Sequence, residues 1–129
     1  MFVNLTNHPV SKWSLEQKWA AGLLAGEVVC MAAYMPMVPP EASSYEVLLL
    51  ATDLLKETLR KIGASDGCCL VQGECTLTHT MVNLLQKKGC LCLAATTNRE
   101  SAEIVQLDGS VKKESVFRFV RFREYAKYE

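Results

Sequence analysis

Apolar runs alternate with segments of helical periodicity along most of the chain. The apolar runs have the length of strands, and the segments between them repeat apolar residues every three to four positions, as helices packed on a sheet do. The predicted strands are Phe2–Thr6, Glu27–Tyr34, Cys68–Gln72 and Cys90–Thr96. The predicted helices are Ser14–Ala25, a helix between Ser43 and Gly63, and Thr76–Lys88.

Capping residues support the helix boundaries. Ser14 with Gln17, and Ser43 with Glu46, have the spacing of a capping box, in which the N-cap side chain and the N3 side chain satisfy each other's backbone N–H groups. The second helix then repeats apolar residues at helical spacing until Gly63, a residue typical of helix C-termini. This helix is the most strongly predicted element of the chain.

The C-terminal part has the pattern of an antiparallel hairpin. Glu103–Leu107 and Ser115–Glu124 flank Asp108-Gly109, a dipeptide that favours a tight turn between strands. A bulge near Val120 would bring the phenylalanines of the last strand into one alignment. We interpret the Phe and Arg alternation there as an edge strand with charged faces or a dimer surface, in preference to an RNA-binding surface.

Together these elements predict an α/β fold. Buried strands that alternate with amphipathic helices are typical of a mainly parallel sheet with helices on both faces. We therefore expect a single Rossmann-like domain over residues 1–129, completed by the C-terminal antiparallel β-hairpin. A chain of 129 residues fits one domain.

Composition and charge exclude several classes of partner. The 14 basic and 14 acidic residues give a net charge of zero, so no global field attracts long nucleic acid or an anionic membrane. No apolar run approaches the roughly 18–20 residues of a membrane span, and the N-terminus lacks the pattern of a signal peptide. We expect a cytoplasmic protein.

The six cysteines are predicted to be thiols rather than a disulfide or zinc framework. They fall at positions 30, 68, 69, 75, 90 and 92, mostly inside apolar runs and without zinc-type spacing. Cys90 and Cys92 alternate, which places both on one face of a strand. Cys75 is the exception, because it lies in a polar turn where a thiol is able to react.

Polar residues follow three of the four predicted parallel strands. Ligands of open parallel sheets bind at the carboxyl ends of the strands, where these residues would converge. The candidates are Thr6, Asn7 and His8 after the first strand, Gln72, Gly73, Glu74 and Thr76 after the third, and Thr96, Thr97, Asn98 and Arg99 after the fourth. The loop after the second strand, Met35–Pro40, is apolar.

Each candidate has a chemical interpretation and a structural one. His8 suits general acid or base work because imidazole exchanges a proton near neutral pH, although a loop histidine is often only solvated. Arg99 offers a planar fork for phosphate or is a surface arginine. Glu74 binds a ribose hydroxyl, acts as a base, or favours the helix N-terminus. The turn Gly73–Thr76 is a candidate anion site, in which Thr76 binds phosphate or caps the helix.

Motifs for common cofactors do not occur in the chain. Neither G-x-G-x-x-G nor G-x-x-x-x-G-K-[ST] is present, and no acidic or histidine cluster accompanies Glu74. We therefore expect no cofactor and no metal.

Four sequence blocks carry a resemblance to a known family. They are "NLTNHPVSKWSLEQKWAA", "VQGECTLTHTMVNLLQKKG", "CLAATTNRES" and "VFRFVRFREY". Together they resemble small CRISPR-associated accessory proteins of type III systems, which are similar to the CRISPR-associated Rossmann fold (CARF) ring nucleases. One departure is the end of the second strand, where that family leads us to expect a polar or acidic group and this chain has Met31-Ala32-Ala33-Tyr34.

The resemblance implies a ligand and a reaction. The ligand would be a cyclic oligoadenylate, cyclic tetra- or hexa-adenylate, bound across the two-fold axis of a homodimer. Without a metal, a ribose 2′-hydroxyl would attack the neighbouring phosphate and give linear oligoadenylate, which ends type III CRISPR signalling. His8 and Arg99 would be catalytic, Gly73–Thr76 would hold the phosphate, and Asn7, Gln72 and Asn98 would contact adenine or ribose.

Two rival functions use the same residues differently. A non-catalytic sensor or sponge would bind the cyclic oligoadenylate through the same loops without cleaving it. A thiol enzyme would use Cys75, but the chain has no C-x-x-C motif to support that function.

Overall fold

The computed structural model describes residues 1–25, 31–32, 35–63 and 67–128. Its strands are β1 (Phe2–Leu5), β2 (Met31–Ala32), β3 (Cys68–Val71), β4 (Leu91–Val105) and β5 (Val111–Glu124). Its helices are a 3₁₀ turn at Val10–Lys12, α1 (Leu15–Ala25), α2 (Ser44–Ile62) and α3 (Cys75–Lys87). The predicted strand Glu27–Tyr34 is seen only as β2, because its other residues lie outside the described ranges.

The strands form one mixed sheet in the order β2-β1-β3-β4-β5. The pairs β1–β2, β1–β3 and β3–β4 are parallel, whereas β4 and β5 are antiparallel. The protein is therefore an α/β protein with a mixed sheet, three α-helices among the described residues and a C-terminal antiparallel pair, as the sequence predicts at this level. No helix in the described ranges has both the length and the apolar composition needed to cross a membrane.

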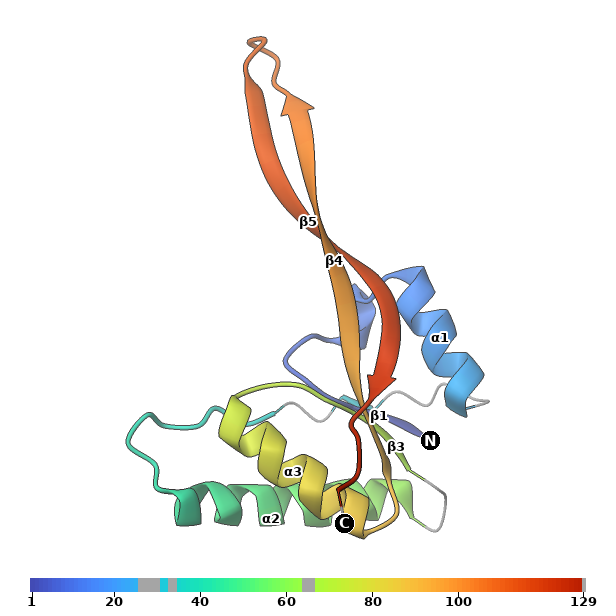
Figure 1. Cartoon of the computed structure of the whole chain (residues 1–129), viewed down its shortest axis with the longest axis vertical. Helices are drawn as coiled ribbons and strands as arrows, with labels where there is room; N and C mark the ends of the chain where they lie inside the picture. Colours follow the sequence, from blue (N-terminus) through green and yellow to red (C-terminus); the bar gives the residue numbers. More distant parts are fainter. Residues whose placement is uncertain (26–30, 33–34, 64–66, 129) are drawn as a thin grey trace.

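Alternate residues of the buried strands contact two separate hydrophobic clusters. In a strand, neighbouring side chains point to opposite faces of the sheet. Accordingly Val3 and Cys69 pack with side chains of α2 and α3, and Phe2 and Cys68 pack with Ala21 of α1. Figure 1 shows α2 and α3 together and α1 apart from them.

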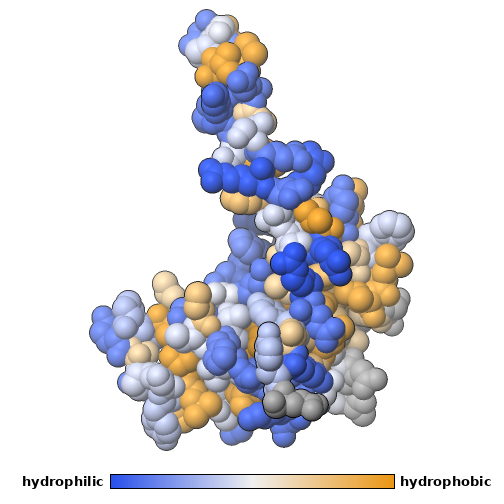
Figure 2. Space-filling view, in the orientation of Figure 1, coloured by the Kyte–Doolittle hydropathy of each residue, from blue (hydrophilic) through white to orange (hydrophobic). Residues whose placement is uncertain are grey.

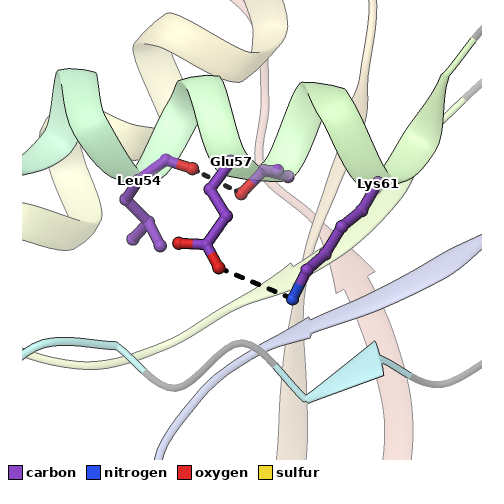
Figure 3. Close-up of polar contacts among 4 residues, drawn as sticks. Leu54, Glu57 and Lys61 are labelled. Carbon is purple, nitrogen blue, oxygen red and sulfur yellow. Dashed lines mark hydrogen bonds and ion pairs between the residues drawn. The ribbon is translucent and has the colours of Figure 1, made fainter.

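Helix α2 confirms the strongest prediction from the sequence. The Ser43–Glu46 capping box is complete, and Gly63 ends the helix with φ of 65°, a conformation that glycine adopts without a steric penalty. The exposed Glu57–Lys61 ion pair, with 3.7 Å between Oε1 and Nζ (Figure 3), contributes little. The buried face of the helix is formed by Val47, Ala51, Leu54, Leu55, Thr58 and Ile62.

The prediction for the C-terminal half was wrong about where the fourth strand ends. Instead of a strand at Cys90–Thr96 and a second one at Glu103–Leu107, β4 runs without a break through Leu91–Val105. Residues 97–100 were expected in a loop because they are polar. In the structure they belong to β4, and their backbone pairs with the antiparallel strand β5. Strand formation here depends on the neighbouring strand more than on local propensity.

The antiparallel pair forms a ribbon that projects far beyond the rest of the molecule (Figure 1). Gly109, with φ of 85°, lies in the turn at its end, as the Asp108-Gly109 signal predicts. Thr96 pairs with Arg121 and Thr97 pairs with Phe119, so Val120 is the extra residue of a bulge. The predicted bulge near Val120 is therefore confirmed.

The cysteines behave as the apolar pattern predicts. Cys68, Cys69, Cys90 and Cys92 are buried free thiols, Cys75 is an exposed one, and Cys30 lies outside the described residues. Burial raises the pKa of the Cys68 thiol to about 11 and that of Cys92 to about 12. These core thiols are therefore protonated near neutral pH, and a protonated thiol is a poor nucleophile.

Candidate functional site

A buried hydrogen-bond network shapes the loop after β1. Asn4 is fully buried, and its Nδ2 donates to the carbonyl oxygen of His8 over 2.8 Å. Thr6, also buried, donates its hydroxyl to Asn4 Oδ1 at 2.7 Å and accepts from the His8 backbone N at 3.1 Å. Trp13 Nε1 donates to the same His8 carbonyl at 3.2 Å. The backbone of His8 is thus held from both sides, while its side chain stays exposed.

The His8 side chain borders a cavity of about 620 Å³ at the carboxyl ends of β1 and β3 and beside the start of the ribbon. We call it the His8 cavity, and its lining residues are Thr6, His8, Lys12, Trp13, Ser14, Gln17, Leu70, Gln72, Ala95, Thr97, Phe117 and Phe119. Four of the predicted site residues meet here: Thr6, His8, Gln72 and Thr97. The cavity therefore brings together side chains that follow β1 and β3 with Thr97, which lies within β4 and not at a strand end as the sequence predicted.

Lys12 is a lining residue that the sequence analysis did not single out. It lies in the 3₁₀ turn between His8 and Trp13 and carries a positive charge to the cavity wall. The available signal was its position four residues after His8, in the same polar loop. A cation beside an imidazole is a suitable pair for contacting a phosphate group.

Aromatic side chains form one wall of the His8 cavity. The ring centroids of Phe119 and Phe122 are 5.0 Å apart, and those of Phe2 and Trp13 are 5.9 Å apart in an edge-to-face arrangement. The bulge at Val120 brings Phe119 and Phe122 to the same face. Trp13 is 7% exposed, so its role is packing. Phe117, in contrast, is 66% exposed and borders the cavity, so its ring is accessible to a ligand.

The amide of Gln72 is used to extend the sheet. Its Nε2 donates to the Ala95 carbonyl at 3.2 Å, and its Oε1 accepts from the Ala95 N–H at 3.1 Å. Strand β3 ends at Val71, so the Gln72 side chain replaces the backbone partner that β4 loses there. The predicted contact of Gln72 with adenine or ribose would have to compete with both hydrogen bonds.

Glu74 occupies the anion site that was predicted at Gly73–Thr76. Glu74 rather than Thr76 is the N-cap of α3, and its carboxylate accepts from the backbone N–H groups of Thr76 at 3.0 Å and Leu77 at 2.9 Å. The Thr76 hydroxyl donates to the same carboxylate at 2.6 Å. Because the protein supplies its own anion, these groups are not free for a phosphate, and the structural interpretation of Glu74 is the one supported.

This cap predicts a pH dependence. The hydrogen bonds from the Thr76 hydroxyl and from the Leu77 and Thr76 backbone lower the pKa of Glu74. A carboxylate with a lowered pKa contributes stability above its unfolded pKa of about 4.3, and this contribution is lost as the pH falls through the folded value. The melting-temperature difference between the native chain and Glu74→Gln should therefore be largest at pH 7 and shrink below about pH 4. Glu41→Gln, on an exposed loop, is the control and should show a small, pH-independent difference.

Arg99, Asn98 and Thr96 lie on the ribbon instead of in a loop. Arg99 donates from Nε and Nη2 to Ser115 Oγ at 3.1 and 3.0 Å and pairs with Phe117. It shares a strand face with Thr97, so it lies just beyond the His8 cavity. Asn98 is on the opposite face, and the Thr96 hydroxyl donates to the Arg121 carbonyl at 3.0 Å.

A second cavity, of about 640 Å³, lies beside α3 and the C-terminal tail. It contains Gln72 and Gly73 among the predicted residues, together with Cys75 and His79. Tyr125 borders it and donates its hydroxyl to the Val71 carbonyl at 2.8 Å. Because fewer predicted residues reach this cavity, the His8 cavity is the stronger candidate site.

Comparison with known proteins gives a family. A curated relative from Methanocaldococcus jannaschii, described as "Uncharacterized protein MJ1673", is 30% identical over 91 residues, which cover 70% of this chain and 67% of the relative. A family model described as "Uncharacterized protein MJ1673 family" matches residues 1–123, from the start of the chain to the last residue but one of β5. The chain therefore belongs to the MJ1673 family.

Proposed function

We propose that this protein binds a cyclic oligoadenylate, cyclic tetra- or hexa-adenylate, and cleaves it to a linear product, which ends type III CRISPR signalling. The observation that carries the proposal is the exposed His8 imidazole in a polar and aromatic cavity at the carboxyl edge of the sheet. The sequence blocks that resemble CRISPR-associated accessory proteins supply the identity of the ligand.

The proposal includes a Rossmann-like, doubly wound arrangement. The order β2-β1-β3-β4 has a switch point between β1 and β3, where such sheets bind ligands. The His8 cavity, lined by Thr6 after β1 and Gln72 after β3, lies at that point. The packing of α1 in one hydrophobic cluster and of α2 and α3 in the other supports helices on both faces.

The proposed chemistry needs positioning and one proton carrier. A ribose 2′-hydroxyl attacks the adjacent phosphorus in line, and the bond to the 5′-oxygen breaks. His8 takes the 2′-proton or gives a proton to the leaving 5′-oxygen. Lys12 stabilises the charge on the phosphate, and Arg99, two residue pairs beyond Thr97 along the ribbon, reaches the next phosphate of a larger ligand.

The other proposed ligand contacts are assigned by the exposure of each side chain. Asn7 and Thr97 are exposed near His8, and the accessible ring of Phe117 suits stacking on adenine, an interaction that contributes about 1–3 kcal/mol per base in single-stranded nucleic acid complexes. Thr6 and Gln72 shape the cavity through their internal hydrogen bonds. A homodimer supplies two such cavities, which matches the rotational symmetry of the ring.

A non-catalytic sensor or sponge is the second candidate function. Among the residues that line the His8 cavity, His8 is the one side chain able to exchange a proton near neutral pH. Efficient cleavage of this type commonly uses both a base and an acid. A single such group is better suited to binding with slow turnover than to rapid catalysis.

Incubation of the purified protein with labelled cyclic tetra- and hexa-adenylate, with and without EDTA, tests the proposal. Linear products that form equally in EDTA are expected. Tight binding without product would contradict cleavage and support the sponge. The absence of binding at micromolar concentrations would contradict both functions.

A further inference from the structure

Helix α1 has an apolar outer face that the described chain leaves exposed. Leu15, Trp19 and Leu23 follow one another at intervals of four residues, which places them on one side of the helix. They are 80%, 73% and 70% exposed, and Ala21 is the one buried residue of α1. A helix with apolar residues around most of its circumference is normally covered on more than one side. We call these three residues the helix stripe.

The ribbon has a second uncovered apolar surface at its far end. Its outer part, residues 97–119, is the arm, and four exposed residues near its turn form the arm tip: Ile104, Val105, Leu107 and Val111. Figure 2 shows hydrophobic residues gathered at this end and over α1. A two-stranded ribbon alone in water is marginally stable, so an arm of this length requires a surface to pack on.

The arm tip of one chain lies far from α1 of the same chain (Figure 1). The root of the arm is fixed by the two Gln72–Ala95 hydrogen bonds and by the bond from the Tyr125 N–H to the Cys92 carbonyl, 2.9 Å long. From this root the arm projects outward, past α1 and beyond the rest of the molecule (Figure 1). The tip therefore reaches a helix stripe only on another molecule.

We propose that two copies of the chain exchange arms, so that the arm tip of each packs on the helix stripe of the other. Each copy contributes both surfaces, which is the reciprocal contact that a two-fold dimer requires. The seven side chains of the helix stripe and the arm tip of each copy, at roughly 100 Å² each, amount to about 700 Å², close to the roughly 800 Å² that each partner buries in a standard interface.

Charge does not oppose this association. The formal net charge of the chain is zero, so two copies do not repel each other at long range. The charged residues next to the arm tip include both Glu103 and Lys113, which pair across the strands. The partner is therefore a second copy of the chain. At each contact, the apolar arm tip of one copy meets the apolar helix stripe of the other.

Arm exchange would also close the His8 cavity. Ser14 and Gln17, at the start of α1, line that cavity, and the helix stripe begins next to them at Leu15. An arm lying along the stripe would pass the cavity mouth and exclude water from a bound ligand. This closing role rests on the proposed function, whereas the dimer contact does not.

Light scattering on the full chain after size-exclusion chromatography tests the contact. The native protein should have about twice the 14.3 kDa mass of one chain. Leu23→Glu in the helix stripe and Leu107→Asp in the arm tip should each give a monomer. Tyr45→Glu, at an exposed apolar residue of α2 outside both surfaces, is the matched control and should remain a dimer.

Mixing the two monomeric variants separates arm exchange from other dimers. In a mixed pair one helix–arm contact is doubly altered and the other is fully native, so association should return with weaker affinity than that of the native dimer. A helix–helix dimer would survive Leu107→Asp, and an arm–arm dimer would survive Leu23→Glu. Either survival, or a native chain that is monomeric at 100 μM, overturns the proposal.

Two further measurements keep folding and function separate from assembly. Far-UV circular dichroism should show that both variants keep the native helix content, and tryptophan emission should lie at shorter wavelength in the native and Tyr45→Glu dimers than in the two monomeric variants. A dimer that binds no cyclic oligoadenylate would contradict the proposed function and leave arm exchange standing. A native chain that is monomeric and cleaves the ring would contradict arm exchange and support the proposed function.

Discussion

Replacing His8 with alanine should lower the rate of the proposed cyclic oligoadenylate cleavage about 10²–10⁴-fold, the usual contribution of one general acid or base. The His8 side chain is exposed in the cavity, and the atoms that hold the loop belong to its backbone, so the fold should be unaffected. Single-turnover rates on labelled cyclic tetra- and hexa-adenylate would measure the loss.

The matched control is His79→Ala, which removes the other histidine of the chain. His79 lies on α3 beside the second cavity and should be dispensable for cleavage. The affinity of His8→Ala for the uncleaved ring should stay within a few-fold of the native value, because proton transfer contributes to the transition state. A His8→Ala protein that retains the native rate would remove His8 from the mechanism.

Replacing Asn4 with leucine should cause the largest loss of stability, about 1–3 kcal/mol, because removing one partner from a buried hydrogen-bond network carries a cost of that size. Leucine has a similar size but offers neither the donor to the His8 carbonyl nor the acceptor for the Thr6 hydroxyl. Urea denaturation would show a lower midpoint at an unchanged slope.

Asn7→Leu, the same change on an exposed residue three positions later, is the control and should alter stability by less than about 0.5 kcal/mol. Hydrogen exchange adds a local measurement, because the His8 N–H should lose protection in Asn4→Leu. If Asn4→Leu and Asn7→Leu have the same midpoint of urea denaturation, the buried network does not hold the His8 loop.

Local signals predicted α2 and the approach of His8 to the sheet edge. The Ser43–Glu46 capping box and the apolar spacing up to Gly63 are short-range features, so they could be interpreted without a partner. His8 follows a strand with four buried residues, and a parallel sheet presents such loops at one edge. The bulge at Val120 was predictable because the aromatic alternation changes phase there.

The remaining site residues depended on contacts that no local pattern records. Glu74 was predicted as one ligand among several, and only the start of α3 revealed that its carboxylate fills the helix N-terminus. Gln72 proved to be a partner of Ala95, 23 residues away. Lys12 was missed because its spacing of four residues from His8 gains meaning only when the 3₁₀ turn brings both residues to the same cavity.

The α/β order of elements, the buried thiols and the polar residues after β1 and β3 could be predicted from local patterns, because apolar periodicity, caps and turn residues act over a few positions. The continuation of β4 through residues 97–105, the internal partners of the polar groups and the uncovered surfaces of α1 and the arm became known from the three-dimensional structure. Those features depend on pairing and burial between distant segments, where one chain folds against itself and leaves particular surfaces without a neighbour.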